Sequence, residues 1–184
     1  MIVLWILLTL VFFVIIAFLG TFNSLIALKV RVENAWSQID VQLKRRHDLI
    51  PNLVETVKGY MSYEKETLEK VIKARQQAID ASGIQDKSQA ENFLTQTLRS
   101  LFAVVERYPD LKANQNVLKL QEELTSTENK ISFARQYYND EVGRFNTQIQ
   151  VVPSNIVAGM MGFGKREFFQ IEDKAEKEVP QVKF

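Results

Sequence analysis

The first 28 residues contain no charged side chain, and this limits the environments in which the segment can fold. Residues 3–19, VLWILLTLVFFVIIAFL, are apolar except for Thr9. A helix over such a segment would extend roughly 40 Å, which is enough to cross a hydrocarbon core about 30 Å thick. The sequence therefore predicts a transmembrane anchor over residues 1–28.

A cleavable signal peptide is the alternative for this segment. Such peptides carry a basic region before a shorter apolar core and end at a small-residue cleavage site. No basic residue precedes the apolar run here, so an uncleaved anchor is favoured. The first basic residues after the run are Lys29 and Arg31. The positive-inside rule then places the following domain in the cytoplasm and the N-terminus outside.

Apolar residues recur at helical spacing through most of the remaining chain, a pattern typical of amphipathic helices. Between residues 25 and 81 they also follow an eleven-residue register, which favours a nearly straight or slightly right-handed helix. The residues on this line are Leu28, Ile39, Ile50, Met61 and Ile72. One helix is therefore expected to run from the membrane to Ala81.

The stretch DASGIQDKSQAENF, residues 80–93, interrupts this periodicity. Gly83 is interpreted as a helix C-cap, and Ser88 with Glu91 as the capping box of a second helix. That helix is expected to end at YPD, residues 108–110, because a proline disfavours helical geometry in the residue before it. Its expected buried residues are Phe93, Leu94, Leu98, Leu101, Phe102 and Val105.

A third helical seam covers residues 111–149 and repeats the eleven-residue register, so the first and third helices are expected to pack along each other like a coiled coil. The repeated positions are Leu120, Ile131 and Val142. A short fourth helix follows Pro153. The predicted fold is all-α, with a transmembrane helix that continues into an elongated antiparallel bundle. This cytoplasmic bundle is assigned to residues 29–164 and a C-terminal tail to residues 165–184.

The composition excludes several classes of function. The 23 basic and 22 acidic residues nearly balance, which argues against a surface that binds nucleic acid through its phosphates. Without cysteine, the chain has no disulfide, no thiolate metal site and no cysteine nucleophile. His47 is the only histidine, and no metal-binding spacing surrounds it. No catalytic residue, metal ligand or cofactor is therefore assigned, and an enzyme is not expected.

Polar residues interrupt the first helix in the stretch AWSQIDVQLKRRHDLIPNLVETV, residues 35–57. Four of them are consecutive and cannot all face water in a packed bundle. They are Lys44, Arg45, Arg46 and His47. In the third helix the apolar seam is interrupted by Glu128 and Arg135. An Arg46–Glu128 ion pair is predicted, because an unpaired buried charge is costly.

Three interpretations remain open for this cluster: a polar lock on the register of the bundle, a ligand or partner surface, and catalysis. The register lock is favoured. Pro51 lacks an amide hydrogen, so it is expected to kink the helix and free a carbonyl near His47. Asn139 and Asn146 are seven residues apart on one face of the third helix. They fit hydrogen bonding at the rim of the core or, alternatively, a homo-oligomer contact.

Residues 159–166, GMMGFGKR, match the first seven positions of the phosphate-binding motif G-x-x-x-x-G-K-[ST]. The eighth position is Arg166 instead of a serine or threonine, and the alternating strands and helices of that fold are missing. Nucleotide binding is therefore not expected. The segment is interpreted as a flexible apolar loop or, equally, as a contact surface for lipid or for another copy of the chain.

Several long motifs resemble the LemA family of bacterial membrane proteins. They are AWSQIDVQLKRRHDLIPNLVETVKGY at 35–60, YPDLKAN at 108–114, LQEELTSTENKISFARQYYNDEVGRFNTQI at 120–149, and the pattern GF, F, P-x-V-x-F toward the end of the chain. The resemblance implies a single N-terminal membrane helix, a short external N-terminus and a cytoplasmic helical domain. It supplies no catalysis or substrate, and one branch of the family is implicated in forming magnetosome membranes.

Together these observations predict a membrane-anchored scaffold or adaptor of the bacterial inner membrane that self-associates or binds another membrane protein. Its polar core or partner surface would comprise Lys44, Arg45, Arg46, His47, Pro51, Glu128, Arg135, Asn139 and Asn146. The alternative is a membrane-shaping module that binds anionic lipid, at about 1 kcal/mol for each basic residue near the headgroups. The lipid-proximal residues would be Lys29 and Arg31, together with Lys165 and Arg166.

Overall fold

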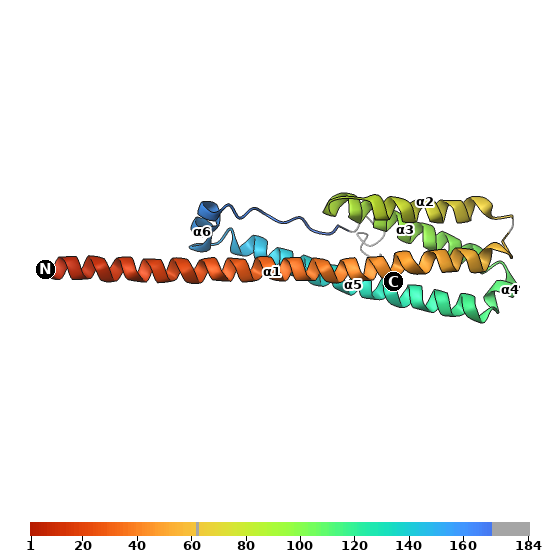
Figure 1. Ribbon diagram of the computed structural model, residues 1–184, viewed down its shortest axis with the longest axis horizontal. Coiled ribbons are helices and arrows are strands. Elements are labelled where there is room, and N and C mark those ends of the chain that lie inside the picture. The colour runs from red at the N-terminus through yellow and green to blue at the C-terminus, as the bar shows by residue number, and fades with distance from the viewer. Residues whose placement is uncertain (62, 171–184) are drawn as a thin grey trace, which may run out of the picture. The chain divides into compact units, whose positions relative to one another are not determined.

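The computed structural model describes residues 1–61 and 63–170 (Figure 1). The described residues form six helices and no strand, so the predicted all-α class is confirmed. The helices are α1 (Ile2–Lys58), α2 (Lys65–Asp80), α3 (Ile84–Val105), α4 (Pro109–Lys112), α5 (Gln115–Gln148) and α6 (Ser154–Met161). The closing P-x-V-x-F motif of the predicted tail lies outside the described residues.

The first helix ends much earlier than the periodicity predicts. Gly59 follows its last residue, and the amides of Tyr60 and Met61 both donate to the carbonyl of Val57, at 3.0 and 3.1 Å. The chain turns there, because glycine is a poor helix former and a tighter hydrogen bond closes the last turn. The expectation of one helix to Ala81 is therefore wrong.

The break changes which residues face the core. Ile39, Ile50 and Met61 on the eleven-residue line are fully buried, but Ile72 is 50% exposed. After the turn, α2 buries a stripe of its own at Leu68, Val71, Ala74 and Ala78. In the sequence, the apolar residues after the turn keep the same helical spacing as those before it, although they belong to a different helix. Periodicity alone therefore could not reveal the turn.

The junction between α2 and α3 also differs from the prediction. α2 ends at Asp80, and Gly83 is the N-cap of α3 with φ of +83°, a left-handed conformation that glycine adopts without steric cost. Ser88 and Glu91 are not a capping box, because both lie inside α3 and are buried. Phe93, predicted to be buried, is exposed.

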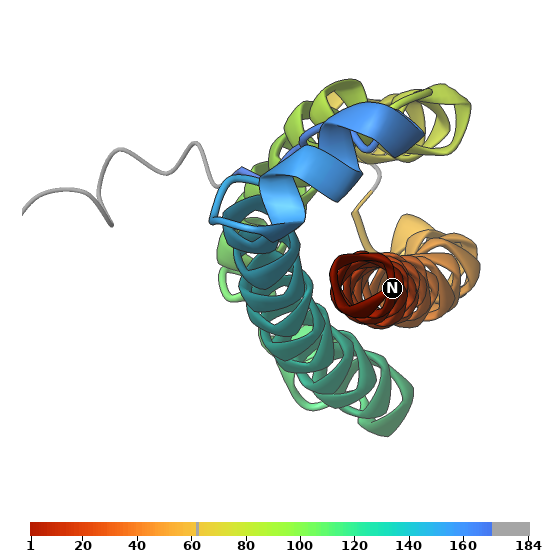
Figure 2. The same ribbon diagram turned by 90° about the vertical axis from the view of Figure 1, so that its left-hand side faces the viewer.

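The chain divides into two compact units, and α1 and α5 contribute to both. Of the described residues, the second unit contains those between 40 and 133 and residues 168–170. In it, α1, α2, α3 and α5 run in alternating directions, and α2 and α3 pack side by side (Figure 1, Figure 2). Burial of apolar side chains is the main driving force for such packing. The core includes Ile50, Leu53, Val57, Val71, Leu94, Leu101, Leu111, Val117 and Leu124.

The first unit contains residues 1–39 and 134–167. Leu25, Val32 and Ala35 of α1 are buried, as are Val142 and Phe145 of α5. Aromatic rings join the elements at three places. The ring centroids of Trp36 and Tyr138 are 5.5 Å apart, those of Phe22 and Phe163 6.2 Å, and those of Phe145 and Phe163 6.3 Å.

Side chains of α5 hold the extended segment that follows α6. The amide of Asn146 donates to the carbonyl of Arg166 and accepts from its backbone N–H, both at 2.8 Å. The hydroxyl of Tyr138 donates to the carbonyl of Glu167 at 2.9 Å. Burial raises the pKa of Tyr138, against the opposing effect of the Arg166 charge, and this favours the neutral hydroxyl that donates the bond.

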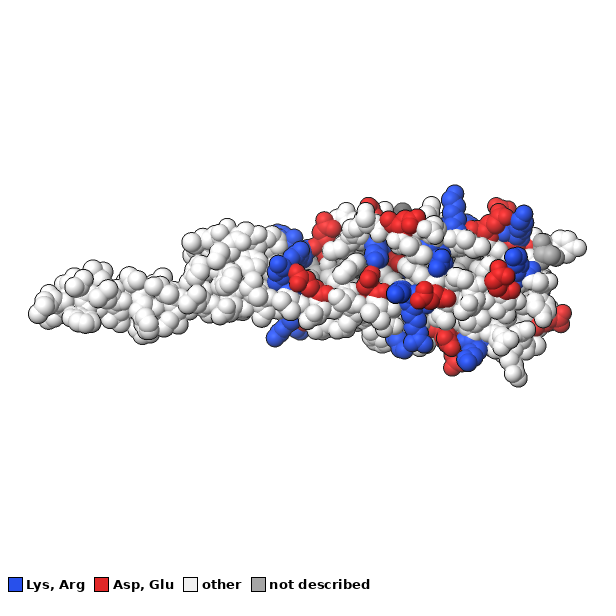
Figure 3. All heavy atoms as spheres, in the orientation of Figure 1, with Lys and Arg blue, Asp and Glu red and all other residues white. Residues whose placement is uncertain are grey.

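Within the described residues, α1 is the one helix that is long and apolar enough to cross a membrane. Its large apolar side chains from Ile2 to Leu19 are exposed in the chain, apart from the half-buried Phe18. Figure 3 shows no charged side chain over this part of the helix on the face in view. An apolar surface of this extent is typical of contact with lipid or protein.

The position of the helix break can be tested with Ile50 and Ile72, which the sequence places on one line. Ile50→Ala should lower the free energy of unfolding by about 2–5 kcal/mol, because it leaves a cavity in the core. Ile72→Ala should change it by about 0.5 kcal/mol or less, because half of this side chain is already exposed. Urea unfolding of the full chain in detergent, followed by circular dichroism, measures both. Equal losses would contradict the break.

Candidate functional site

A buried arginine lies at the centre of the second unit. Arg46 is on the inner stripe of α1 between Leu43 and Ile50, and it is only 1% exposed. Because an isolated charge in an apolar interior costs several kcal/mol, about 3–5 when a partner is lost, this guanidinium needs partners on neighbouring helices.

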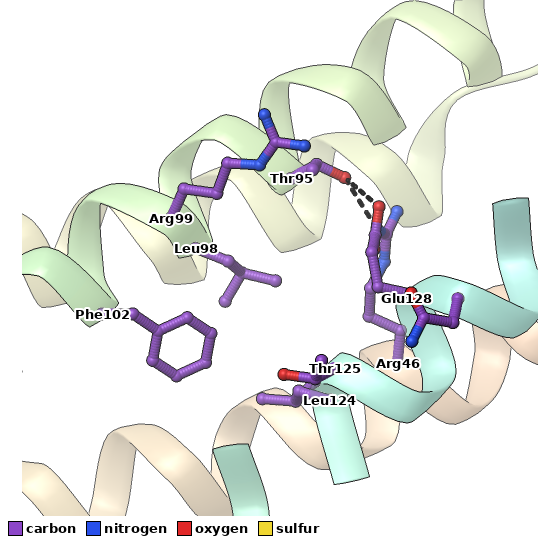
Figure 4. A pocket seen from close by; sticks show the side chains of 9 residues that line it. Arg46, Thr95, Leu98, Arg99, Phe102, Leu124, Thr125 and Glu128 are labelled. Atoms are coloured by element: carbon purple, nitrogen blue, oxygen red, sulfur yellow. Dashed lines mark hydrogen bonds and ion pairs between the residues drawn. The ribbon is translucent and has the colours of Figure 1, made fainter. Parts of the chain in front are cut away.

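Two carboxylates and a hydroxyl provide these partners, and Figure 4 shows one carboxylate, that of Glu128, and the hydroxyl of Thr95. Nη2 of Arg46 forms an ion pair with Oε2 of Glu91 in α3. Nη1 is 2.5 Å from Oε2 of Glu128 in α5 and 2.8 Å from the hydroxyl of Thr95 in α3. That hydroxyl in turn donates to Oε1 of Glu128 at 3.2 Å. One guanidinium therefore joins α1, α3 and α5.

His47 extends the network to α2. Its Nε2 lies 2.9 Å from Oε1 of Glu91, so this carboxylate lies between Arg46 and the imidazole. The backbone carbonyl of His47 has no helical donor, because Pro51 four residues later lacks an amide hydrogen. Arg75 of α2 replaces the missing donor, and its Nε donates to the His47 carbonyl at 2.7 Å. The freed carbonyl predicted near His47 is present, and α1 continues as a helix through Pro51.

The structure contains the predicted Arg46–Glu128 pair, but it does not gather all the candidate residues into one site. Lys44, Arg45 and Pro51 are exposed on α1 and take no part in the buried network. Arg135, Asn139 and Asn146 lie in the stretch of α5 that belongs to the first unit. Arg135 and Asn139 are half-buried there, and the amide of Asn146 is engaged by Arg166 within the chain.

Sequence reasoning missed Glu91, which is 2% exposed and is the most buried carboxylate of the network. Its spacing from Ser88 suggested a cap. The stronger signal was its position three residues before Leu94 and seven before Leu98, on the buried stripe of α3. An acidic residue on an apolar stripe indicates a buried partner of opposite charge. Arg75 was also missed, since its acceptor is a backbone atom.

A cavity of about 190 Å³ lies beside the network, between α3 and α5 with α1 at its floor (Figure 4). Arg46, Thr95 and Glu128 form its polar end, and both apolar side chains and the polar residues Arg99, Thr125 and Asn129 line the remainder. The apolar side chains are Leu98, Phe102 and Leu124. Arg46 and Glu128 at the polar end are bound to each other, so they join α1 to α5.

The described residues contain no group of three or more histidine, cysteine or acidic side chains placed to hold a metal ion. Residues 159–166 also lack the arrangement of a phosphate loop. That motif places its glycine-rich loop before a helix, so that the helix N-terminus faces the phosphates. Here Gly159 lies inside α6, and Gly162 ends the helix with φ of +71°. The loop therefore follows a helix C-terminus.

Comparison with known proteins gives one family. The model described as "LemA family" matches residues 35–184, a range that includes Arg46, Glu91 and Glu128. The chain is 29% identical over 161 residues to Protein LemA of Metamycoplasma hominis, covering 85% of this chain and 72% of that protein. It is 23% identical over 186 residues to Magnetosome protein MamQ 2 of Paramagnetospirillum magneticum, covering 85% and 68%. With Magnetosome protein MamQ of Magnetospirillum gryphiswaldense it shares 21% over 199 residues, covering 91% and 73%.

Removing the buried charge of Arg46 should lower the free energy of unfolding far more than removing the exposed charge of Arg45. Arg46→Met should lower the free energy of unfolding by about 3–5 kcal/mol, because Glu91 is left as an uncompensated buried charge. Adding Glu91→Leu should recover most of this loss, since an apolar pair of similar volume can replace a buried ion pair. The measurement is urea unfolding of the full chain.

The matched control is Arg45→Met, which removes an exposed charge and should change stability by about 0.5 kcal/mol or less. An Arg46→Met variant that resembles this control would show that the network does not stabilise the bundle. So would a failure of Glu91→Leu to recover any stability.

Proposed function

This chain belongs to the LemA family, and from that premise we propose that it is a non-catalytic helical scaffold or adaptor anchored in the bacterial inner membrane. The observation that carries the proposal is the continuity of α1. One helix from Ile2 to Lys58 provides both the uncharged N-terminal segment and the arginine that joins the bundle. The anchor and the centre of the bundle are thus parts of a single secondary-structure element.

The state of the buried charges supports a structural role. Arg46 binds Glu91 and Glu128, and His47 lies against Glu91. A catalytic group needs a free lone pair or proton directed at a substrate, whereas these groups are directed at one another. We infer that the network fixes the register of the helices and that function resides on the surface of the bundle.

Exposed aromatic residues on α5 support a protein partner, either a second copy of the chain or another membrane protein. Phe133 is 72% exposed, and Tyr137 is exposed one turn further along the helix. Phenylalanine and tyrosine are enriched in protein interfaces, where they bury a large apolar area. Positive residues after the anchor, Lys29 and Arg31, favour a cytoplasmic bundle and an external N-terminus.

A second candidate is association with anionic lipid headgroups, favoured by one local arrangement. Glu33 brings basic residues from distant parts of the chain together just after the uncharged segment. Its carboxylate lies 3.8 Å from Nζ of Lys29 and 3.9 Å from Nη2 of Arg166. Lys165 and Arg31 are nearby in sequence, and each basic residue near an anionic surface contributes about 1 kcal/mol.

The scaffold proposal predicts a discrete assembly through the α5 aromatic residues. Full chain in nanodiscs should have the mass of a small multiple of the protomer, and Phe133→Glu should reduce it, because a buried carboxylate would be unpaired at the contact. Lys119→Glu, an exposed change about four turns earlier on the same helix, is the control and should leave the mass unchanged. Light scattering measures the mass. A monomer whose Phe133 position crosslinks to no membrane protein in cells would contradict the proposal.

The orientation can be tested because the chain has no native cysteine. A cysteine introduced as Ser37→Cys should be protected from a membrane-impermeant maleimide in spheroplasts. Adding Lys29→Glu and Arg31→Glu should raise the labelled fraction roughly twofold or more, because these charges favour retention on the cytoplasmic side. Lys65→Glu with Lys70→Glu lies far from the span and should have no effect. Labelling of the Ser37→Cys variant that keeps Lys29 and Arg31 would show that the bundle is external.

A further inference from the structure

A long uncharged stretch surrounds α6. Between Arg144 and Lys165 the sequence contains no charged residue. α6 itself, Ser154–Met161, buries Ser154, Val157 and Ala158 against the rest of the first unit. Apart from the N-terminal segment, a stretch this long without charge is unusual in a chain whose charged content is 24%.

The outward face of α6 is apolar. Met160 is 70% exposed, and Ile156, one turn earlier on the same face, is also exposed. Val151, Val152 and Met161 add further exposed apolar area at the two ends of the helix. A continuous apolar surface of this kind marks a contact with lipid or protein, because water solvates it poorly.

Contacts within the first unit place this surface along α1. Phe163, just after α6, packs against Phe22 of α1, and Leu25 of α1 is fully buried. Three residues after Phe163, the side chain of Arg166 reaches Glu33. The apolar Phe163 thus contacts the uncharged part of α1. Arg166 contacts α1 beyond Lys29, which is the first charged residue of this helix.

The length of the anchor leaves room for such an arrangement. About 20 helical residues cross a hydrocarbon core, whereas the uncharged segment of α1 continues to Leu28. The surplus is about eight residues, or roughly 12 Å of helix, and Phe22 and Leu25 lie within it. This part of α1 therefore belongs to the boundary between acyl chains and headgroups, and α6 accompanies it there.

We propose that α6 is an interfacial membrane element whose outward face, around Ile156 and Met160, inserts into the leaflet from which α1 emerges at Lys29. This proposal rests on the anchor role of residues 1–28 in the proposed function. Lys165 and Arg166 would then lie at headgroup level, beside Lys29. Short helices with one apolar face and nearby basic residues bind membranes in this manner.

A depth measurement on the full chain tests the proposal. Single-cysteine variants Met160→Cys, Phe12→Cys and Ser37→Cys are labelled with an environment-sensitive fluorophore and reconstituted in nanodiscs whose lipids carry bromine on the acyl chains. Bromine quenches a fluorophore only at short range. The label at Met160 should be quenched by about half or more and its emission should shift to the blue, as expected for a group at the acyl boundary.

The other two positions separate the outcomes. Phe12 should be quenched because it lies in the anchor, and Ser37 should not be, since it is exposed on α1 beyond Lys29. Quenching at Phe12 but not at Met160 would overturn the α6 proposal and leave the anchor intact. No quenching at Phe12 would reject the anchor itself. A blue shift at Met160 without quenching would show that a second protein surface covers α6, which also overturns the proposal.

A substitution provides an independent measurement. Ile156→Asp introduces a charge on the outward face of α6, and it should abolish the quenching at Met160 while leaving that at Phe12 unchanged. Gln136→Asp introduces the same charge at an exposed site of α5 and serves as the control. Persistent quenching at Met160 in the Ile156→Asp variant would contradict insertion of this face.

Discussion

The second unit depends on one cation that has to be satisfied in an apolar interior. Arg46 forms its bonds only when α3 brings Glu91 and α5 brings Glu128 to the same level of α1. A shift of either helix by one or two turns would leave a buried charge unpaired, whereas it could keep apolar side chains facing one another. The apolar stripes make the helices associate, and the guanidinium selects the alignment in which they do so.

Proline has a complementary effect at the same level. Pro51 would weaken an isolated helix, because one carbonyl loses its donor. In this chain the carbonyl belongs to His47, and Arg75 from α2 binds it. A local defect in α1 has become the point at which a fourth helix is attached, so α2 is oriented by a polar contact as well as by its apolar face.

Much of this arrangement follows from the sequence, and the failures have physical causes. The all-α class and the Arg46–Glu128 pair were predictable, because helical period and the cost of buried charge are both local properties. The turn at Gly59 was not predictable, since the apolar residues beyond it keep the helical spacing of those before it. Glu91 was misassigned because its two possible roles, cap and buried partner, differ only in where α3 begins, and Gly83 determines that start.

The clamp between Asn146 and the backbone of Arg166 has a consequence for the order of events during synthesis. Residues 163–167 leave the ribosome after every helix they bind. Phe163 has no pocket until α1 and α5 are in place, since its ring packs on Phe22 and Phe145. This segment can therefore pack only after the residues of both helices have been synthesised.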